Sequence, residues 1–264
     1  MIGLSAFLYP FVADYVNSFR QSRVVAQYYT DLATLNKEDF TELFTVAKVY
    51  NEELINKSER FSFSGKDAGE YEELLNPFGN GIMGTLNIKR IGVRLPIYHG
   101  TSESVLQTGV GHFEGSSLPV GGPGTHSVIT GHRGLPSSTL LTKLDKMHVG
   151  DTFVLHILNE TLTYQIDQIL VVVPEDMRAL AIEPGKDYCT LVTCTPYGIN
   201  SHRMMLRGSR IPNVAELGIE EPDAAEIDSL SVAAVIFLPV LIVVAAYLVI
   251  RLNRIYRFFG RRKT

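Results

Sequence analysis

Apolar residues recur at helical spacing in the first part of the chain. From position 40 to 54 they stand three or four residues apart, at Phe40, Leu43, Phe44, Ala47, Tyr50 and Leu54. This spacing gives a helix one apolar stripe. Asn36, followed three residues later by Asp39, is typical of a helix start. The pattern predicts helix over residues 13 to about 58, within an N-terminal helical region that extends to residue 75.

The part of this helical region that follows the apolar stripe is polar. Asn56–Gly69 contains glycines and charged residues and predicts a mobile loop. Tyr71–Leu75 favours one further helical turn.

The pattern changes at Gly84, where short β-favouring runs alternate with Gly, Pro and Asn. These runs are Thr85–Ile88, Val93–Tyr98, Ser127–Thr130, Thr152–Leu158, Leu162–Val173, Tyr188–Cys194 and Arg203–Arg210. Seven or eight strands spaced in this way predict a mainly β domain over residues 76–212, folded as a closed or nearly closed barrel. Two short helices are expected to interrupt it, near Ser102–Gln107 and Ser137–Leu144.

The C-terminal pattern is that of a membrane anchor. An acidic linker (213–228) precedes 22 uncharged residues (229–250), which as a helix would span the hydrocarbon core of about 30 Å. Six basic residues and no acidic one follow, in a tail over 251–264. The positive-inside rule then places the C-terminus in the cytoplasm and the rest of the chain outside the cell membrane. The alternative is a buried core helix.

Charge and the N-terminal residues add to this topology. Net charge is −4 overall, but positions 1–250 alone carry −10, which argues against a nucleic-acid partner. Residues 1–12 are apolar but short for a span and lack a positively charged leader. We interpret them as the remnant of a signal or second anchor, the alternative being the apolar face of the first helix.

The chain has two cysteines, Cys189 and Cys194, five positions apart in one predicted strand. An odd separation places them on opposite faces, where they cannot bridge each other. A thiol that stays free in an exported protein is a candidate functional group. Cys189, inside the apolar run, is expected to be a core residue.

Three segments carry candidate chemistry. One apolar run ends in Gly131-His132, another ends at Cys194, and Arg203 begins a further run nine residues later. Nine residues suit an adjacent antiparallel strand, which would put Cys194 and Arg203 side by side. A thiol needs a proton acceptor such as histidine to become a nucleophile, and a guanidinium stabilises an oxyanion. Each residue alone also has an ordinary structural interpretation, so spacing by itself leaves a Cys/His enzyme as a hypothesis.

The run Thr190–Cys194 (TLVTC), with Arg203 downstream and Gly131-His132 upstream, resembles the sortase signature. The likeness extends over about 76–211 and includes residues 84–88, 91–101, 111–122 and 132–136. Together with the C-terminal anchor, these stretches are similar to class C sortases, the pilin polymerases of Gram-positive bacteria. The resemblance implies an eight-stranded sortase barrel with an N-terminal helical extension. It also implies Cys194 as nucleophile, His132 as acid/base and Arg203 as oxyanion donor, with no metal or organic cofactor.

Other residues have weaker assignments. Thr193 and Thr195 flank the nucleophile and are candidates for positioning substrate, or for simple strand packing. Class C sortases carry an Asp-Pro-aromatic lid, but residues 56–71 contain no Asp-Pro pair. Phe61 and Phe63 are the candidates for the lid position, and autoinhibition by the usual plug is not expected.

The expected function is that of a cysteine transpeptidase. It would cleave an LPXTG-like sorting signal between Thr and Gly and pass the acyl group to a pilin lysine. One alternative is a cell-wall-anchoring sortase that uses a peptidoglycan cross-bridge amine. Another is a non-catalytic, sortase-like assembly scaffold.

Overall fold

The computed structural model of the chain describes residues 2–57, 59–62, 65–213 and 251. The chain divides into two compact units, Met1–Glu221 and Pro222–Thr264. The description that follows concerns the first unit, because Arg251 is the one described residue of the second. The predicted linker (213–228) beyond Asn213, the predicted span (229–250) and the tail beyond Arg251 lie outside the described residues.

Among the described residues, four α-helices precede or interrupt the β-structure. They are α1 (Ile2–Leu32), α2 (Lys37–Ile55), α3 (Gly65–Glu73) and the short α4 (Glu103–Leu106). The start of α2 is fixed as expected: the Asn36 side chain accepts from the backbone N–H of Asp39, and the Asp39 carboxylate accepts from that of Asn36. α1 includes the apolar residues before position 13 in one continuous helix. Within the described residues, no helix combines the length and apolar character that a membrane crossing needs.

Two local predictions are wrong. The loop expected over Asn56–Gly69 ends at Gly65, where α3 begins. The buried Tyr71 side chain holds this polar helix, with its hydroxyl 2.8 Å from Nδ1 of His112. The helix expected over Ser137–Leu144 is also absent, and turns lead instead into the 3₁₀-helix η2 (Leu144–Lys146).

Local contacts explain why Ser137–Leu144 does not form a helix. Leu140 has a positive φ of 34°, outside the right-handed helical region. The backbone N–H of Thr139 donates to the Asp14 carboxylate of α1 at 2.6 Å. The Asp14 contact ties this turn to α1, and the φ of Leu140 interrupts a helix at its centre.

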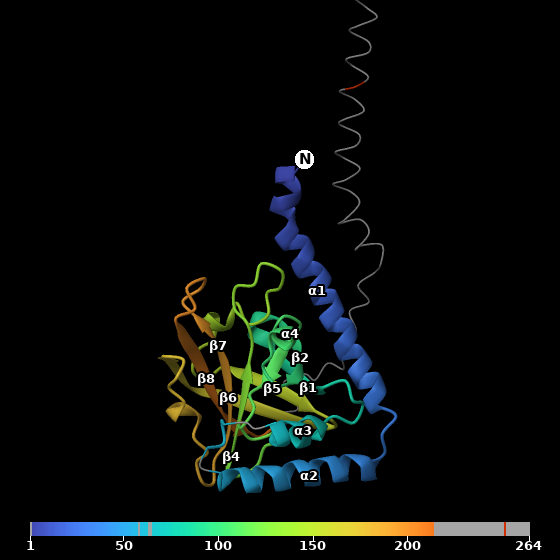
Figure 1. Cartoon of the computed structure of the whole chain (residues 1–264), viewed down its shortest axis with the longest axis vertical. Helices are drawn as coiled ribbons and strands as arrows, with labels where there is room; N and C mark the ends of the chain where they lie inside the picture. Colours follow the sequence, from blue (N-terminus) through green and yellow to red (C-terminus); the bar gives the residue numbers. More distant parts are fainter. Residues whose placement is uncertain (1, 58, 63–64, 214–250, 252–264) are drawn as a thin grey trace, which may run out of the picture. The chain divides into compact units, whose positions relative to one another are not determined.

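Eight strands form a closed barrel (Figure 1). They are β1 (Ile82–Ile88), β2 (Val93–His99), β3 (Val110–His112), β4 (Thr125–Thr130), β5 (Thr152–Ile157), β6 (Glu160–Val172), β7 (Asp187–Thr195) and β8 (His202–Ile211). Around the barrel the order is β1-β2-β3-β4-β7-β8-β6-β5. Strand pairs β2/β3 and β4/β7 are parallel, and the other neighbours are antiparallel. The predicted mainly β barrel is confirmed; β3, only three residues long, has no counterpart among the predicted strands.

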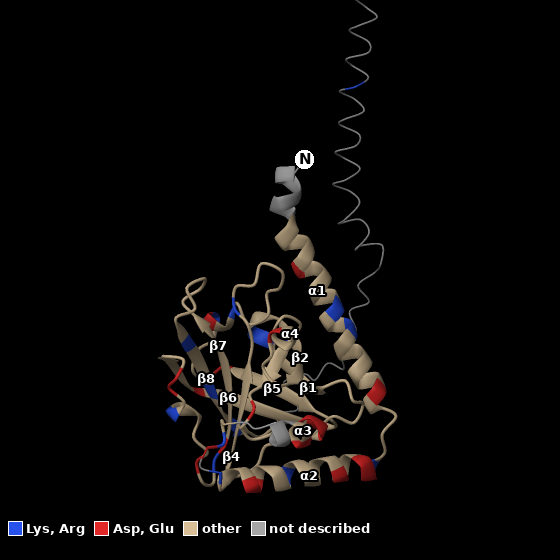
Figure 2. Cartoon of the chain, viewed as in Figure 1, with Lys and Arg blue, Asp and Glu red and all other residues tan. Residues whose placement is uncertain are grey.

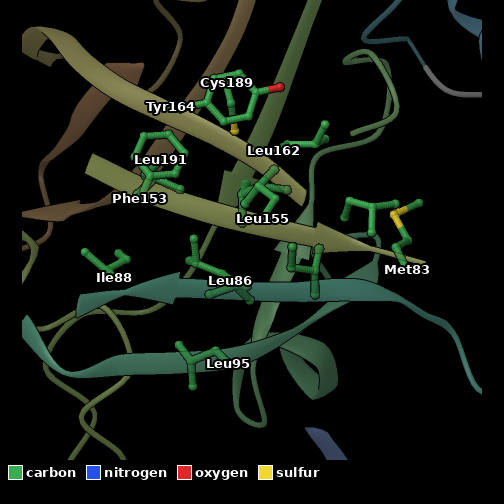
Figure 3. Close-up of a cluster of buried hydrophobic side chains, with 14 of the residues drawn as sticks. Met83, Leu86, Ile88, Leu95, Phe153, Leu155, Leu162, Tyr164, Cys189 and Leu191 are labelled. Atoms are coloured by element: carbon green, nitrogen blue, oxygen red, sulfur yellow. The ribbon is translucent and has the colours of Figure 1, made fainter. Parts of the chain in front are cut away.

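The barrel interior is filled by apolar side chains from alternate strand positions (Figure 3). Cys189 and Leu191 of β7 point into this core, where Phe153 and Tyr164 stack with ring centroids 5.5 Å apart. Gly208 of β8 fits beneath these rings, because a Cβ there would lie 2.7 Å from the Phe153 ring. The interior is therefore filled with side chains, and the candidate reactive residues are to be sought on the outer face of the barrel.

The N-terminal helices attach to the barrel through buried polar contacts as well as apolar ones. The Tyr28 hydroxyl of α1 donates to the carbonyl of Met83 at 3.0 Å and accepts from the N–H of Leu158 at 3.1 Å. The buried Asn51 amide of α2 makes two hydrogen bonds with the backbone of Leu118. Acidic residues are spaced along α2 (Figure 2).

Candidate active site

Neighbouring strands β4, β7 and β8 carry apolar side chains on their outer faces as well as their inner ones. Val128, Val192 and Met205, with Leu180 from the β6–β7 connection, form a cluster separate from the barrel core. We call these four residues the outer apolar cluster. Alternate residues of a strand share a face, so Cys194, two positions after Val192, and Arg203, two before Met205, lie on this same outer face.

A cavity of about 270 Å³ opens beside the outer apolar cluster. It is lined by side chains and backbone from Thr101, Leu106, Phe113, Val128, Thr130, Gly131, His132, Pro174, Met177, Leu180, Val192, Thr193, Cys194, Arg203 and Met205. The candidate nucleophile, acid/base and oxyanion donor therefore share one cavity. Its wall is mostly apolar, and the thiol, imidazole and guanidinium of these three residues lie at the strand ends.

Cys194 and Arg203 are paired directly across β7 and β8. The antiparallel register matches the arrangement that their nine-residue separation predicts. The guanidinium of Arg203 donates through Nη1 to the carbonyls of Asn200 and His202, each at 3.2 Å. These contacts hold the arginine side chain against its own turn, where Asn200 has a positive φ of 60°. Cys194 is a half-buried free thiol.

His132 directly follows Gly131, where the chain leaves β4. The backbone N–H of Gly131 donates to the Val192 carbonyl at 3.1 Å, and the Thr193 hydroxyl donates to the Gly131 carbonyl at 2.8 Å. A Cβ at Gly131 would lie 2.8 Å from Leu141, so glycine permits the close approach. These contacts tie the residue before His132 to the residue before Cys194.

A carboxylate pairs with the imidazole from the side of α4. Nε2 of His132 lies 3.2 Å from Oε2 of Glu103, the first residue of that helix. The pair was not anticipated from the sequence, since 29 positions separate its members. The His132 side chain is about one quarter exposed (24%), whereas that of Glu103 is 66% exposed.

Arg133 forms a second link between the two strand ends. Its Nη2 donates to the Asp145 carboxylate at 2.7 Å and its Nη1 to the Thr195 hydroxyl at 3.3 Å. The two threonines proposed to position substrate thus both hydrogen-bond to protein groups. Thr193 also lines the cavity, so a substrate contact there stays a prediction; Thr195 does not line it.

The lid-position residue Phe61 packs beside the cavity. Its ring lies 5.4 Å, centroid to centroid, from that of Phe113, which lines the cavity, and it contacts the outer apolar cluster. Arg60 anchors this segment by donating to the carbonyls of Gly115 and Leu180. Gly115 must be a glycine here, because a Cβ would meet the Arg60 carbonyl oxygen. Phe63 lies outside the described residues.

The other cysteine and the buried histidines have structural environments. Burial raises the pKa of the Cys189 thiol well above its usual range, which leaves it unreactive. Burial also lowers the pKa of His112 and of His126 to about 4, so both are neutral at pH 7. Their ring nitrogens contact Tyr71 and Ser117, and Ala181 and Thr190, respectively. Across the described part of the chain, no group of three His, Cys, Asp or Glu side chains is arranged to hold a metal ion.

Sequence reasoning missed the apolar wall of the site. In the structure most residues of β4 and β7 are buried on both faces of the strand, although one face of a barrel strand normally meets water. Two-sided burial requires a cover, and the β6–β7 connection and the Arg60–Phe61 segment provide it.

Comparisons with known proteins agree with this site. A family model for the sortase domain matches residues 86–211. Sortase D of Bacillus subtilis is 29% identical over 131 residues, which are 48% of this chain and 63% of that protein. The crystal structure of sortase C1 from Streptococcus agalactiae is 48% identical, with a TM-score of 0.71, and the alignment covers 73% of this chain and all of that one. Sortase C of Streptococcus pneumoniae is 42% identical, with a TM-score of 0.64, and covers 73% of this chain and 98% of that one.

These matches include both strands that carry Cys194 and Arg203 and the strand that leads to His132. A relative that is 48% identical and covered along its whole length shares more than the barrel outline. The chain therefore belongs to the sortase family of cysteine transpeptidases, in the sortase C group of these solved structures.

Proposed function

We propose that this protein is a pilin-polymerising transpeptidase that cleaves an LPXTG-like sorting signal between Thr and Gly. The observation that carries the proposal is the shared cavity of Cys194, His132 and Arg203, in a chain whose solved relatives are sortases of type C. One of those structures is described as informative on pilin substrate specificity.

In the proposed first step, His132 takes the proton of the Cys194 thiol, and the sulfur attacks the Thr carbonyl of the sorting signal. Arg203 stabilises the oxyanion, since its guanidinium keeps its proton through the reaction. His132 then returns the proton to the departing Gly amine as the C–N bond breaks. A thioacyl group remains on Cys194.

The apolar wall of the cavity supports a substrate with an aliphatic residue near the cleaved bond. Val192 and Met205 lie two residues along their strands from Cys194 and Arg203, and Val128 lies two residues before the end of β4, which leads to His132. The leucine of an LPXTG-like signal fits such a surface, because burying it removes apolar area from water.

In the second step, a lysine amine of the next pilin subunit attacks the thioacyl carbonyl. The C–S bond breaks, an isopeptide bond forms, and the thiol is regenerated with the proton released by the amine. The protein is further proposed to be anchored through residues 229–250, with its barrel outside the cell and its C-terminus in the cytoplasm. Tethering enzyme and both substrates to one membrane would raise their effective concentration. Protease digestion of intact cells would test this topology: loss of the barrel with retention of the basic tail is expected.

The experiment that tests the activity combines the full-length protein with an LPXTG peptide and follows intact mass. A thioacyl adduct that is absent from Cys194→Ala is expected. If folded protein gave no adduct and no cleavage, this result would contradict the proposed reaction and favour the scaffold alternative. Supplying a pilin or a cross-bridge peptide as acceptor then separates polymerisation from cell-wall anchoring, according to which amine is consumed faster.

A further inference from the structure

We propose that Glu103 is a positioning residue for His132, which fixes the imidazole so that Nδ1 is the nitrogen that exchanges a proton with Cys194. This inference rests on the proposed acid/base use of His132 and extends the set of functional residues beyond Cys194, His132 and Arg203.

The contact between Glu103 and His132 involves Nε2 of the imidazole and leaves Nδ1 for the proton exchange with Cys194. Oε2 of Glu103 lies 3.2 Å from Nε2 of His132, while within the described residues no hydrogen-bond partner faces Nδ1. Glu103 begins α4, and both Thr101, two residues before it, and Leu106, at the end of α4, line the catalytic cavity. The carboxylate is thus attached to the wall of the site itself.

A second hydrogen bond, from Gln107, fixes the position of the Glu103 carboxylate. The side-chain amide of Gln107, one helical turn later, donates to Oε1 of Glu103 at 3.0 Å. That hydrogen bond and the neighbouring His132 both lower the pKa of the Glu103 carboxyl. Gln107, Glu103 and His132 therefore form a chain of contacts that ends at the acid/base.

The consequence follows from the hydrogen-bonding capacity of each group. An ionised carboxylate only accepts, so the Nε2 facing it must carry the proton. In the neutral imidazole the lone pair is then on Nδ1. When the S–H bond of Cys194 breaks, its proton forms the N–H bond at Nδ1, and the resulting imidazolium lies beside the Glu103 carboxylate. Orientation of a histidine base by a carboxylate is the arrangement used in Ser-His-Asp sites.

A surface ion pair is the competing interpretation. Exposed pairs contribute little to stability, so thermal denaturation would not distinguish the two. The effect on kcat does distinguish them, because a pair that acts only on stability leaves kcat unchanged.

The test uses full-length protein labelled with ¹⁵N-histidine, in four forms: wild type, Glu103→Gln, Gln107→Ala and the control Glu42→Gln on exposed α2. Nitrogen chemical shifts report which ring nitrogen of His132 is protonated, without any substrate. Steady-state kinetics with an LPXTG peptide then give kcat and KM. Glu103→Gln is nearly isosteric, so folding should be unaffected.

We expect wild-type His132 to be protonated at Nε2 and Glu103→Gln to show a mixture of tautomers. Its kcat should fall about fivefold, the upper range for an exposed pair, with little change in KM. Gln107→Ala should show a smaller fall, and Glu42→Gln none. Unchanged nitrogen shifts in Glu103→Gln, or a rise in KM alone, would overturn the inference. If the tautomer responds but wild type leaves the peptide uncut, the proposed substrate is wrong and the positioning role stands.

Discussion

Cys194 of β7 and Arg203 of β8 are direct cross-strand partners, joined through a short turn. Both side chains lie on the outer face of the barrel, and both line one cavity with His132. The pairing fixes the thiol relative to the guanidinium through the ladder of two long strands. A hydrogen-bonded ladder is stiffer than a loop, so the oxyanion donor needs little reorganisation when the reaction begins.

Replacing Arg203 with lysine should lower kcat of peptide cleavage about 100-fold or more, since lysine keeps the charge but loses the planar fork of donors. KM should change much less. Steady-state kinetics on the purified protein would check this. The matched control is Arg207→Lys, on the same strand, whose guanidinium pairs with Asp167 outside the cavity. Equal losses in the two variants would mean that the defect comes from strand β8 and not from the oxyanion.

The contact between Thr193 and Gly131 gives a second prediction. Thr193→Val keeps the side-chain shape but removes the hydroxyl that donates to the Gly131 carbonyl. The buried carbonyl then loses a side-chain partner, at a cost of about 1–2 kcal/mol in the free energy of unfolding. Because the lost contact directly precedes His132, kcat should fall as well. Urea denaturation and steady-state kinetics measure the two effects, and a stability loss without a change in kcat would confine Thr193 to strand packing.

The register of Cys194 and Arg203 could be predicted from the sequence because it depends on local spacing. Two β-favouring runs separated by a short turn leave few possible pairings. The helix cap at Asn36 was predictable for the same reason, since its partners are three residues apart. Both predictions use interactions between near neighbours in the chain.

Contacts between distant segments could not be predicted in this way. The ion pair of His132 with Glu103 and the packing of Phe61 on Phe113 join segments whose approach depends on how the barrel closes. The helix expected at Ser137–Leu144 is interrupted at Leu140, whose φ is positive, in a turn that Asp14, 125 residues away, binds through the backbone of Thr139. Local propensity is a weak prior when a tertiary partner competes for the same backbone group.

The Arg60–Phe61 segment leads to a prediction about access to the thiol. Arg60→Ala removes two hydrogen bonds from a charged donor, to the carbonyls of Gly115 and Leu180. Such bonds contribute about 1.5 kcal/mol each, so the segment should leave the outer apolar cluster at least tenfold more often. Alkylation of Cys194 by a bulky thiol reagent should become correspondingly faster.

Arg90→Ala is the control for this experiment, because Arg90 is an exposed arginine that pairs with Asp151 on another part of the surface. An unchanged alkylation rate in Arg60→Ala, with the protein still folded, would show that the segment does not limit access. Cys189 is buried and should remain unlabelled in every variant.

The buried histidines predict a loss of stability in mild acid. Burial lowers the pKa of His126 to about 4, below the value near 6.5 of an unfolded histidine. Between these values the unfolded chain binds more protons than the folded one, so the free energy of unfolding rises with pH. Stability should therefore fall as pH decreases from about 6.5 to 4, by roughly 1.4 kcal/mol per pH unit for each such histidine. His112 has the same shift and adds to the slope.

Variants of single histidines separate this effect from general acid sensitivity. His126→Gln keeps an amide that can bond to Ala181 and Thr190 but cannot be protonated, so its stability should depend less steeply on pH in this window. His148→Gln is the control, because the His148 side chain is 70% exposed. Urea denaturation at pH 7 and pH 5 gives both slopes. A shallower slope in His126→Gln alone supports the burial argument, whereas parallel slopes in all three proteins would assign the acid sensitivity to carboxylates instead.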